Sequence, residues 1–246
     1  MARIVVLGAS GSMGRKVAEV LTAAGHDVVR ASRATGVDAV SGSGLSAAFA
    51  GADAVVDCLN IVTNVRGKAV TFFTAAAERV LAAAEQAGVG HLVVLSIVNT
   101  TDPTVRGALG YYGGKAAHEE AYAAGDVPLT VVATTQWFDL AEQFLTQARV
   151  GPLALVPSMM LQPVHPAAAA DLLSEVAVGD PQGRVQLAGP ERIRADEMTR
   201  RLAQVRGDGV RVLGVPFPGK GFRRDGLLPR GDFQTDPRTY AAWLAD

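Results

Sequence analysis

The first fourteen residues constrain the fold of this chain more than any other stretch. An apolar run at residues 4–7 passes directly into a turn with glycines at positions 8, 11 and 14, and apolar residues then recur at Val17, Val20 and Leu21. That recurrence, at i, i+3 and i+4, is typical of a helix that packs one side against a sheet. The segment therefore predicts a buried strand, a glycine-rich turn and a helix in immediate succession.

The glycine spacing of this unit suits a dinucleotide. The first glycine makes a tight turn, the second lets the backbone approach a pyrophosphate, and the third lets the helix pack closely on the strand. The phosphates then accept hydrogen bonds from the free N–H groups at the helix N-terminus. An ordinary turn is the alternative, because the chain contains 27 glycines. We expect the turn to supply these cofactor-binding residues: Gly8, Ser10, Gly11, Ser12, Met13 and Gly14.

Apolar runs alternate with helical patterns through the first 150 residues. Strands are expected at 28–32, 54–59, 91–96 and 129–134, with a short additional one within 33–42, and helices at 45–49, 70–86 and 111–124. This alternation implies an α/β fold, a Rossmann-type doubly wound parallel sheet with helices on both faces. Ligands in such sheets bind beyond the carboxyl ends of the strands. Leu59 and Asn60 lie at one such end and join the predicted cofactor residues.

The elements become shorter after residue 150. Extended segments are expected at 153–156, 163–164 and 184–187, and helices at 167–178, 195–205 and 240–244. We predict that residues 1–150 form an NAD(P)-binding Rossmann core and that residues 151–246 form a smaller substrate-binding lobe of the same structural domain. Apolar residues in a loop-like stretch of this lobe favour a hydrophobic substrate: Phe217, Phe222, Leu227 and Leu228.

Composition argues against several classes of function. Lys and Arg number 23 against 24 Asp and Glu, a formal net charge of -1, so no strong field exists to hold nucleic acid or an anionic membrane. No apolar run approaches the roughly 18 residues of a membrane span, and a core strand begins too early for a signal peptide. The single Cys58 forms no internal disulfide, which suits a reducing compartment. We expect a cytoplasmic protein with a small-molecule substrate, no nucleic-acid or membrane partner and no metal ion; the oligomeric state stays open.

The end of the second strand indicates which dinucleotide fits. Enzymes that prefer NAD place Asp or Glu there to hold the ribose 2′-OH, whereas an arginine accommodates a 2′-phosphate. Here the stretch contains Arg30, Ser32 and Arg33 and no acid. NADP(H) is therefore the predicted cofactor, with Ser32 and Arg33 beside the 2′-phosphate and Arg15 and Arg30 as helpers. In the alternative these arginines are simply solvated.

A second group of residues carries the predicted chemistry. Tyr111 and Lys115 stand at i and i+4, on one side of a helix. A tyrosine with a pKa near 10 transfers protons poorly at neutral pH, and a lysine cation nearby lowers that pKa because it favours the phenolate. Tyr112 competes for the same role, and Ser96 is placed to donate a hydrogen bond to the same substrate oxygen. In the alternative the tyrosines pack on the sheet and Lys115 is solvated.

Two weaker groups complete the candidates. Trp137 and Phe138 follow the strand at 129–134 and are predicted to line the substrate pocket, with core packing as the alternative. A glycine-rich stretch also contains three cationic side chains. They either meet an anionic substrate or, as the default interpretation, are solvated: Lys220, Arg223 and Arg224.

Together these motifs resemble those of the short-chain dehydrogenase/reductases, specifically their atypical, NmrA-like, NAD(P)-binding branch. The resemblance spans nearly the whole chain and rests on the glycine turn with Arg15, on Ser32 and Arg33, on Ser96, on Tyr111 with Lys115, and on residues 133–138 and 161–164. It implies that Tyr111 is the catalytic acid/base, that Lys115 holds the nicotinamide ribose, and that Ser96 orients the substrate.

The branch that the chain resembles includes NADPH-dependent reductases, non-redox biosynthetic enzymes and proteins that only sense the dinucleotide. We predict an NADPH-dependent reductase of a small, hydrophobic carbonyl, enone or imine, in which Tyr111 supplies the proton. A non-catalytic NADP(H) sensor, and a non-redox lyase, isomerase or cyclase on the same fold, are the alternatives.

Overall fold

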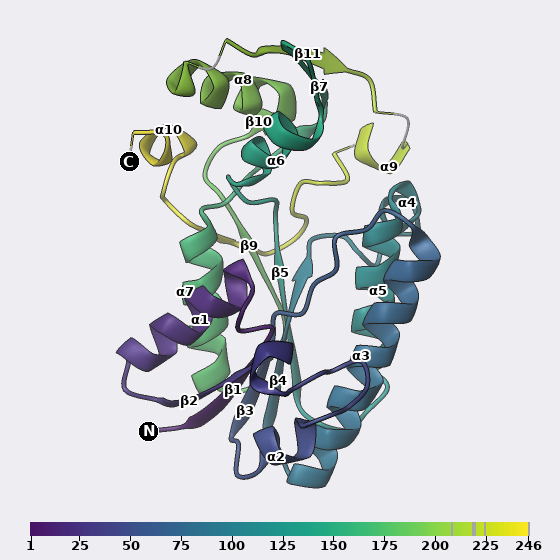
Figure 1. The fold of residues 1–246 in the computed structure, drawn as a ribbon, viewed down its shortest axis with the longest axis vertical. Coiled ribbons are helices and arrows are strands. Elements are labelled where there is room, and N and C mark those ends of the chain that lie inside the picture. Colours follow the sequence, from purple (N-terminus) through teal and green to yellow (C-terminus); the bar gives the residue numbers. More distant parts are fainter. Residues whose placement is uncertain (208, 218–219, 224, 246) are drawn as a thin grey trace.

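Seven parallel strands form the central sheet (Figure 1). The computed structural model describes residues 1–207, 209–217, 220–223 and 225–245. Across the sheet the order is β2 (Asp27–Ala31), β1 (Arg3–Leu7), β3 (Ala54–Asp57), β4 (His91–Ile97), β5 (Leu129–Thr134), β9 (Gly183–Ala188) and β12 (Gln234–Thr235). The order reverses at β1, because β2 lies on one side of it and β3 on the other. The α/β, doubly wound fold class is confirmed, and the reversal marks the crevice where such sheets bind ligands.

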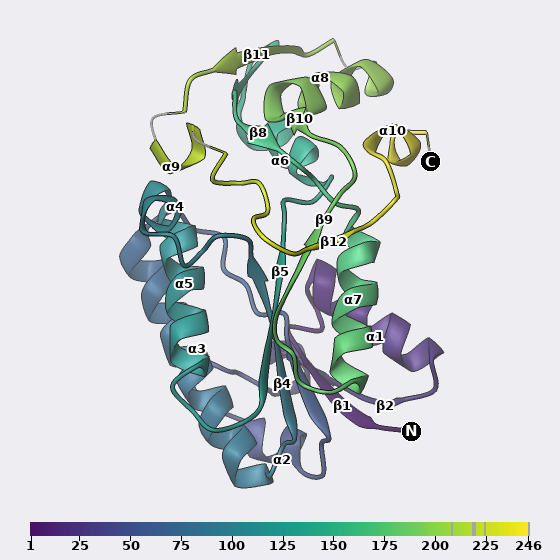
Figure 2. The ribbon, with the colours of Figure 1, turned by 180° about the vertical axis from the view of Figure 1, so that it is seen from behind.

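Helices cover both faces of the sheet. On one face lie α1 (Ser12–Ala23) and α7 (Pro166–Val178), and on the other α3 (Arg66–Ala87) and α5 (Gly110–Tyr122), with α2 (Leu45–Phe49) against α3 (Figures 1 and 2). Successive side chains of β1 lie on opposite faces of the sheet, because side chains alternate along a strand. Val6 packs in the core beneath α1 and α7, whereas Val5 packs in the core beneath α2 and α3. This two-sided burial explains why the strand is apolar throughout.

Two glycines let α5 lie close to α3 and the residues that precede it. At Gly114 a Cβ would stand 2.7 Å from the Ala69 Cβ and 2.9 Å from the Phe73 ring. At Gly110 it would overlap the backbone of Arg66. The pair of adjacent glycines on α5 therefore has a packing role, and the helix is continuous through it from Gly110 to Tyr122.

A lobe stands above the edge where the strands have their carboxyl ends, which we call the carboxyl edge (Figure 1). It contains two small sheets and a core of its own, separate from the two cores of the central sheet. Its elements are α6 (Leu140–Gln147), β6 (Arg149–Val150), β7 (Leu153–Pro157), β8 (Met160–Leu161), β10 (Ile193–Arg194), α8 (Ala195–Arg206), β11 (Arg211–Val215), α9 (Lys220–Arg223) and α10 (Tyr240–Trp243). The chain after residue 150 thus contributes both to this lobe and, through α7, β9 and β12, to the central sheet.

Some elements differ from the sequence-based expectation. Residues 33–42 form no strand; they contain a 3₁₀ helix, Arg33–Thr35, and the bridge from Asp38 to Ser43 lies outside any strand. Gly36, at φ +82, ends that short helix and turns the chain back. An unpredicted helix, α4 (Pro103–Ala108), has a recognisable start, because the Asp102 side chain accepts the Thr104 N–H and proline follows it. Within the described ranges, none of the helices has both the length and the apolar character that a bilayer crossing requires.

Candidate cofactor and catalytic site

The glycine turn after β1 is shaped by close backbone contacts. Gly8 has a φ of +72, and a Cβ there would lie 2.9 Å from the Cys58 carbonyl oxygen, at the end of β3. The Gly11 N–H donates to the Gly8 carbonyl at 2.8 Å. At Gly14 a Cβ would overlap that same carbonyl. The turn therefore has no room for a side chain at Gly8 or Gly14. In a dinucleotide-binding turn these are the positions that make the tight turn and let the helix pack closely on the strand.

The surroundings of the turn suit a pyrophosphate. Ser10, Gly11 and Ser12 are exposed, and the first turn of α1 contains no acidic side chain. Gly11 caps α1 without a side-chain hydrogen bond, so the first N–H groups of the helix are available to an anion. Met13 differs from this expectation in one respect, because its side chain is buried in the core. Only its backbone N–H faces the candidate site.

The end of β2 presents cations without a competing acid. Arg30 and Arg33 are exposed, as is Arg15 on α1, and none of the three forms an ion pair with any residue that the structure describes. Ser32 is buried, and its backbone N–H donates to the Thr35 hydroxyl at 2.9 Å. Ser32 therefore shapes the turn that carries Arg33.

Tyr111 rather than Tyr112 bonds a predicted cofactor residue. The Tyr111 hydroxyl donates to the Asn60 Oδ1 at 2.8 Å, which brings the start of α5 against the segment that follows β3. The Tyr112 hydroxyl accepts from the Gln136 Nε2 at 3.2 Å, and its ring packs on Phe222 in the lobe core. Burial raises the pKa of Tyr112 to about 12. Of the two tyrosines, Tyr111 is the one whose hydroxyl faces the predicted cofactor residues.

Lys115 bonds a backbone carbonyl rather than the Tyr111 hydroxyl in this arrangement. Its Nζ donates to the Leu95 carbonyl at 2.9 Å and lies 4.6 Å from the centre of the Phe73 ring. Burial raises the pKa of Tyr111 above its usual value, and the neighbouring Tyr112 adds to the shift. The expectation that Lys115 lowers the pKa of Tyr111 is therefore wrong here, because the ammonium is bonded inward and the phenol is largely desolvated.

Ser96 is bonded to a carboxylate that sequence reasoning missed. The buried Ser96 hydroxyl donates to Glu119 Oε1, which also accepts the Thr100 hydroxyl at 2.6 Å. Arg184, from β9, donates to the other oxygen of Glu119 at 2.7 Å. Ser96 was expected to donate to a substrate oxygen, but in this geometry its single proton is already used. The available signal was the spacing of Glu119, one helical turn after Lys115 on the same side of α5.

A second polar group lies under α5, at the end of β3. Asp57, His118 and Tyr122 are each fully buried. Asp57 Oδ2 accepts the Tyr122 hydroxyl at 2.5 Å and lies 3.0 Å from His118 Nε2, while Oδ1 accepts the Leu59 N–H at 2.7 Å. The signal in the sequence was an acid inside the apolar run at 54–59, which a buried strand tolerates only with partners. Leu59, a predicted cofactor residue, is thereby fixed through its backbone.

The two predicted pocket residues have different environments. Phe138 is 1% exposed and packs against Tyr240 and Trp243 in the lobe core, so it lines no pocket. Phe138 packs in the lobe core because the chain enters the lobe directly after this residue. Trp137 is partly exposed, and its Nε1 donates to the Thr134 hydroxyl at 3.0 Å, at the carboxyl edge. Arg224 lies outside the described residues, as do the side chains of Lys220 and Arg223.

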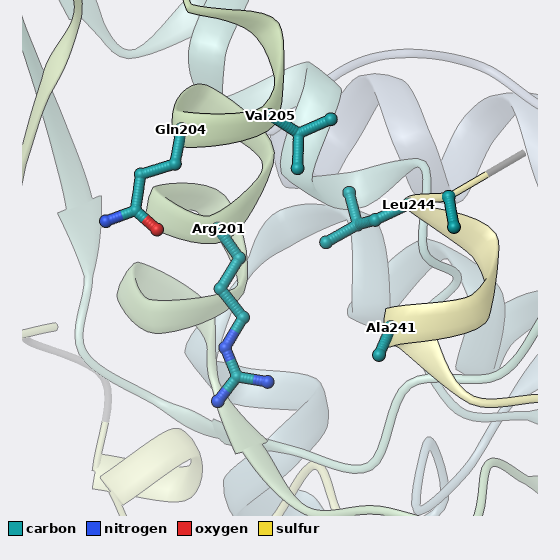
Figure 3. Close-up of a pocket in the computed structure, with 6 residues that line it drawn as sticks. Arg201, Gln204, Val205, Ala241 and Leu244 are labelled. Carbon is teal, nitrogen blue, oxygen red and sulfur yellow. The ribbon is translucent and has the colours of Figure 1, made fainter.

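A surface groove between α8 and α10 is separate from these residues. Figure 3 shows the guanidinium of Arg201 on one side and Leu244 on the other. Its remaining lining comes from Gln204, Val205, Ala241 and Ala245. Both helices belong to the outer part of the lobe, whereas the predicted cofactor and catalytic residues lie at the carboxyl edge (Figure 1). The groove therefore plays no part in the candidate site.

Several known structures have a fold similar to that of this chain. The fold matches a dTDP-4-dehydrorhamnose reductase from Bacillus anthracis in complex with NADP, with 14% identity, a TM-score of 0.72 and coverage of 97% of this chain and 91% of that one. It also matches a nucleoside-diphosphate-sugar epimerase from Staphylococcus aureus, with 15% identity, a TM-score of 0.75 and full coverage of both chains. A short-chain dehydrogenase/reductase superfamily protein from Agrobacterium tumefaciens with bound NAD has 18% identity, a TM-score of 0.70 and coverage of 99% and 95%.

One relative is similar in sequence as well. It is the (4-alkanoyl-5-oxo-2,5-dihydrofuran-3-yl)methyl phosphate reductase of Streptomyces griseus subsp. griseus, 31% identical over 226 residues, which cover 86% of this chain and 77% of the relative. No family model matches the chain. With this relative, the shared fold and the glycine turn at the strand reversal, the chain belongs to the short-chain dehydrogenase/reductase superfamily.

Proposed function

We propose that this protein is an NADPH-dependent reductase of a small, hydrophobic carbonyl, enone or imine substrate. The observation that carries the proposal is the position of Tyr111. Its hydroxyl bonds Asn60, two residues beyond the Cys58 carbonyl that faces Gly8 in the glycine turn. A proton donor therefore lies at the crevice between the ends of β1 and β3, where a doubly wound sheet binds its dinucleotide.

NADPH is favoured over NADH by the charges at the end of β2. A 2′-phosphate adds negative charge at this place, and Arg33 is exposed there without an ion pair to any described residue. Arg15 and Arg30 add two further cations nearby. No carboxylate follows β2 to hold a ribose 2′-OH, because the sequence from Arg30 to Arg33 contains no acid.

The proposed reaction requires a hydride and a proton. When bound, the dinucleotide supplies the hydride to the carbon of the substrate double bond. Tyr111 supplies the proton to the heteroatom or carbon that receives the electron pair, and its phenolate then regains a proton from solvent. Burial raises the pKa of Tyr111, so the phenol is protonated throughout the neutral range but is a weaker acid than a free tyrosine.

The substrate class draws on the relative with similar sequence. The name of that relative describes an alkanoyl-substituted unsaturated lactone that carries a phosphate ester. Such a molecule contains a conjugated C=C and carbonyl, which fits the enone class proposed here. It is therefore the first substrate to test, together with simple ketones and enones of the same size.

The test follows consumption of NADPH in the presence of these substrates. For Tyr111→Phe we expect kcat about 10²–10⁴-fold lower, the usual contribution of a positioned acid, with NADPH affinity nearly unchanged. Tyr112→Phe is the matched control and should retain most of its activity, because the Tyr112 hydroxyl is bonded to Gln136. Unchanged turnover in Tyr111→Phe would show that the assigned proton donor is wrong.

A dinucleotide sensor is the second candidate, and a specific observation favours it. The donor groups of Tyr111, Lys115 and Ser96 are all bonded within the protein, to Asn60, Leu95 and Glu119. A sensor needs the glycine turn and the arginines but none of these donors. It predicts binding that distinguishes NADP⁺ from NADPH with no hydride transfer to any of the tested carbonyl compounds.

A further inference from the structure

The ammonium of Lys115 is buried and forms no ion pair with any residue that the structure describes. The residue is 3% exposed, and its Nζ donates to the Leu95 carbonyl of β4. The Phe73 ring of α3 lies on another side of the group. Both neighbours are neutral, and a buried ammonium is costly unless an anion balances it. The Lys115 ammonium therefore requires a negatively charged side chain nearby.

Asp57 and Lys115 lie close together in the fold, because Asp57 pairs with Val94 of β4, next to the Leu95 carbonyl that Lys115 bonds. His118, one turn after Lys115 on α5, contacts the Asp57 carboxylate at 3.0 Å. Four titratable groups from the end of β3 and from α5 therefore act on Lys115. Burial lowers the pKa of Lys115 below its usual 10.5, whereas Asp57, Cys58 and Glu119 favour the charged form and His118 lies beside them. Cys58 carries no charge at neutral pH, because burial raises the pKa of its thiol. Burial also lowers the pKa of His118, which is therefore neutral. Two carboxylates remain.

Glu119 already has a cationic partner. Its Oε2 accepts Arg184 Nη1 at 2.7 Å, and its Oε1 accepts two hydroxyl groups. Asp57 forms no ion pair with a Lys or Arg among the described residues; its three partners are the His118 ring, the Tyr122 hydroxyl and the Leu59 N–H. Burial alone raises the pKa of Asp57, but His118, the Lys115 charge and the Tyr122 hydroxyl lower it. With His118 neutral, Lys115 is the cation that stabilises the Asp57 carboxylate, while Glu119 is balanced by Arg184.

We propose that Asp57 is a positioning residue that keeps Lys115 charged inside the candidate site, while His118 and Tyr122 hold its carboxylate in place. Asp57 touches neither cofactor nor substrate in this role and acts through Lys115. Its importance for turnover rests on the proposed function, in which the Lys115 ammonium holds the nicotinamide ribose. The charge relation between the two side chains does not depend on that function.

The first experiment measures the protonation of Lys115 directly, without cofactor or substrate. Lysine labelled with ¹³C at Cε gives few signals, because the chain contains only Lys16, Lys68, Lys115 and Lys220. In Asp57→Asn we expect Lys115 to titrate at least about one pH unit lower than in the wild type, the effect of losing a close opposite charge. Asp53→Asn, on the same loop-and-strand segment but exposed, is the control and should leave Lys115 unmoved. An unmoved Lys115 in a folded Asp57→Asn protein overturns the proposal.

A reciprocal experiment covers the case in which Asp57→Asn does not fold. Lys115→Met removes the ammonium but leaves every hydrogen bond to Asp57 intact. With ¹³C-labelled aspartate, Asp57 should then titrate at a higher pH than in the wild type, since coupling between two charges is mutual. If the titration of Asp57 is the same in both proteins, the two charges are not coupled and the proposal fails.

An activity measurement then asks whether the coupling matters for the proposed reductase. In Asp57→Asn the alkaline limb of kcat/KM should move to lower pH by as much as the Lys115 titration moves. A shifted titration with an unshifted activity profile would retain the charge relation but remove Lys115 from the proposed reaction. The two failures are therefore distinguishable.

Discussion

The two halves of the candidate site are built in opposite ways. The glycine turn after β1 is exposed at residues 10–12 and consists of backbone, with Gly8 against the end of β3 and Gly14 against Gly8. The polar region under α5 consists of side chains from distant elements, with Asp57 from β3 and Glu119 from α5 buried and the more exposed Arg184 from β9 bonded to Glu119. The first half depends on the absence of side chains, and the second depends on hydrogen bonds and ion pairs among side chains.

The two halves should therefore respond differently to amino-acid substitution. A backbone site loses its shape when any Cβ is added, because nothing can move aside. A buried polar network loses stability when one partner is removed, because the remaining groups cannot reach water. The predictions below test these two responses in turn.

The largest effect is expected at the third glycine of the turn. Gly14→Ala places a Cβ against the Gly8 carbonyl, so we expect the free energy of unfolding to fall by about 3 kcal/mol and NADPH binding to weaken at least roughly 100-fold. Chemical denaturation and calorimetric titration measure the two quantities. The control is Gly67→Ala on α3, where a Cβ meets open space; it should stabilise the helix by about 0.5–1 kcal/mol. Equal behaviour of the two variants would contradict the backbone account of the turn.

The next effect tests pairing in the buried half. Glu119→Gln removes the charge that Arg184 meets and disturbs the acceptor of two hydroxyl groups, so a loss of about 2 kcal/mol is expected in the free energy of unfolding. Glu120→Gln, at the next position, breaks only the exposed pair with Arg106 and should cost less than about 1 kcal/mol. A loss in Glu119→Gln no larger than in Glu120→Gln would mean that the network contributes little.

A third prediction concerns the positive charge of Arg33 at the end of β2. Arg33→Ala should weaken NADPH binding about tenfold, or about 1.4 kcal/mol, and leave NADH binding unchanged. Arg79→Ala is the control, because Arg79 is exposed on α3, in the second half of that helix and away from the carboxyl edge. If Arg33→Ala affects both dinucleotides alike, Arg33 does not recognise the 2′-phosphate.

The smallest effect concerns the pH dependence of the buried half. Burial lowers the pKa of His118 below 6.5 in the folded protein. Below that pH, His118 is therefore more fully protonated in the unfolded chain than in the folded chain. The free energy of unfolding should therefore fall as pH drops below 6.5, by up to about 1.4 kcal/mol per pH unit from this residue.

His118→Gln isolates that contribution, because a glutamine amide can still donate to Asp57 but does not titrate. Denaturation between about pH 5 and pH 7 should give a shallower slope for the variant than for the wild type. Parallel slopes would show that His118 takes up its proton equally in both states.

The same contrast explains what the sequence predicted. The strand, the turn and the helix were read correctly from residues 4–21, because their contacts are local and leave glycines at fixed spacing. The parallel sheet followed from the alternation of elements. The sequence did not predict helices α4, α6 and α9 or strands β6, β8, β10, β11 and β12, because these elements are short and most of them depend on packing in the lobe.

The candidate site was predicted less completely. Tyr111 bonds Asn60, which follows the strand end whose Cys58 carbonyl faces Gly8 in the turn. The partners of Ser96 and Lys115 were not foreseen, because Glu119, Arg184 and Asp57 come together only when β3, α5 and β9 are packed. The core position of Phe138 likewise depends on where the lobe begins, which no local pattern records.

A crystal structure of the protein with NADP⁺ and a substrate analogue tests the central claim most directly. We predict that the pyrophosphate accepts hydrogen bonds from the N–H groups of residues 10–13, and that the Tyr111 hydroxyl turns from Asn60 to the reacting oxygen of the analogue, at about 2.6–3.2 Å. A dinucleotide bound in the turn with Tyr111 still on Asn60 would contradict the reductase mechanism, and a dinucleotide bound elsewhere would contradict the site itself.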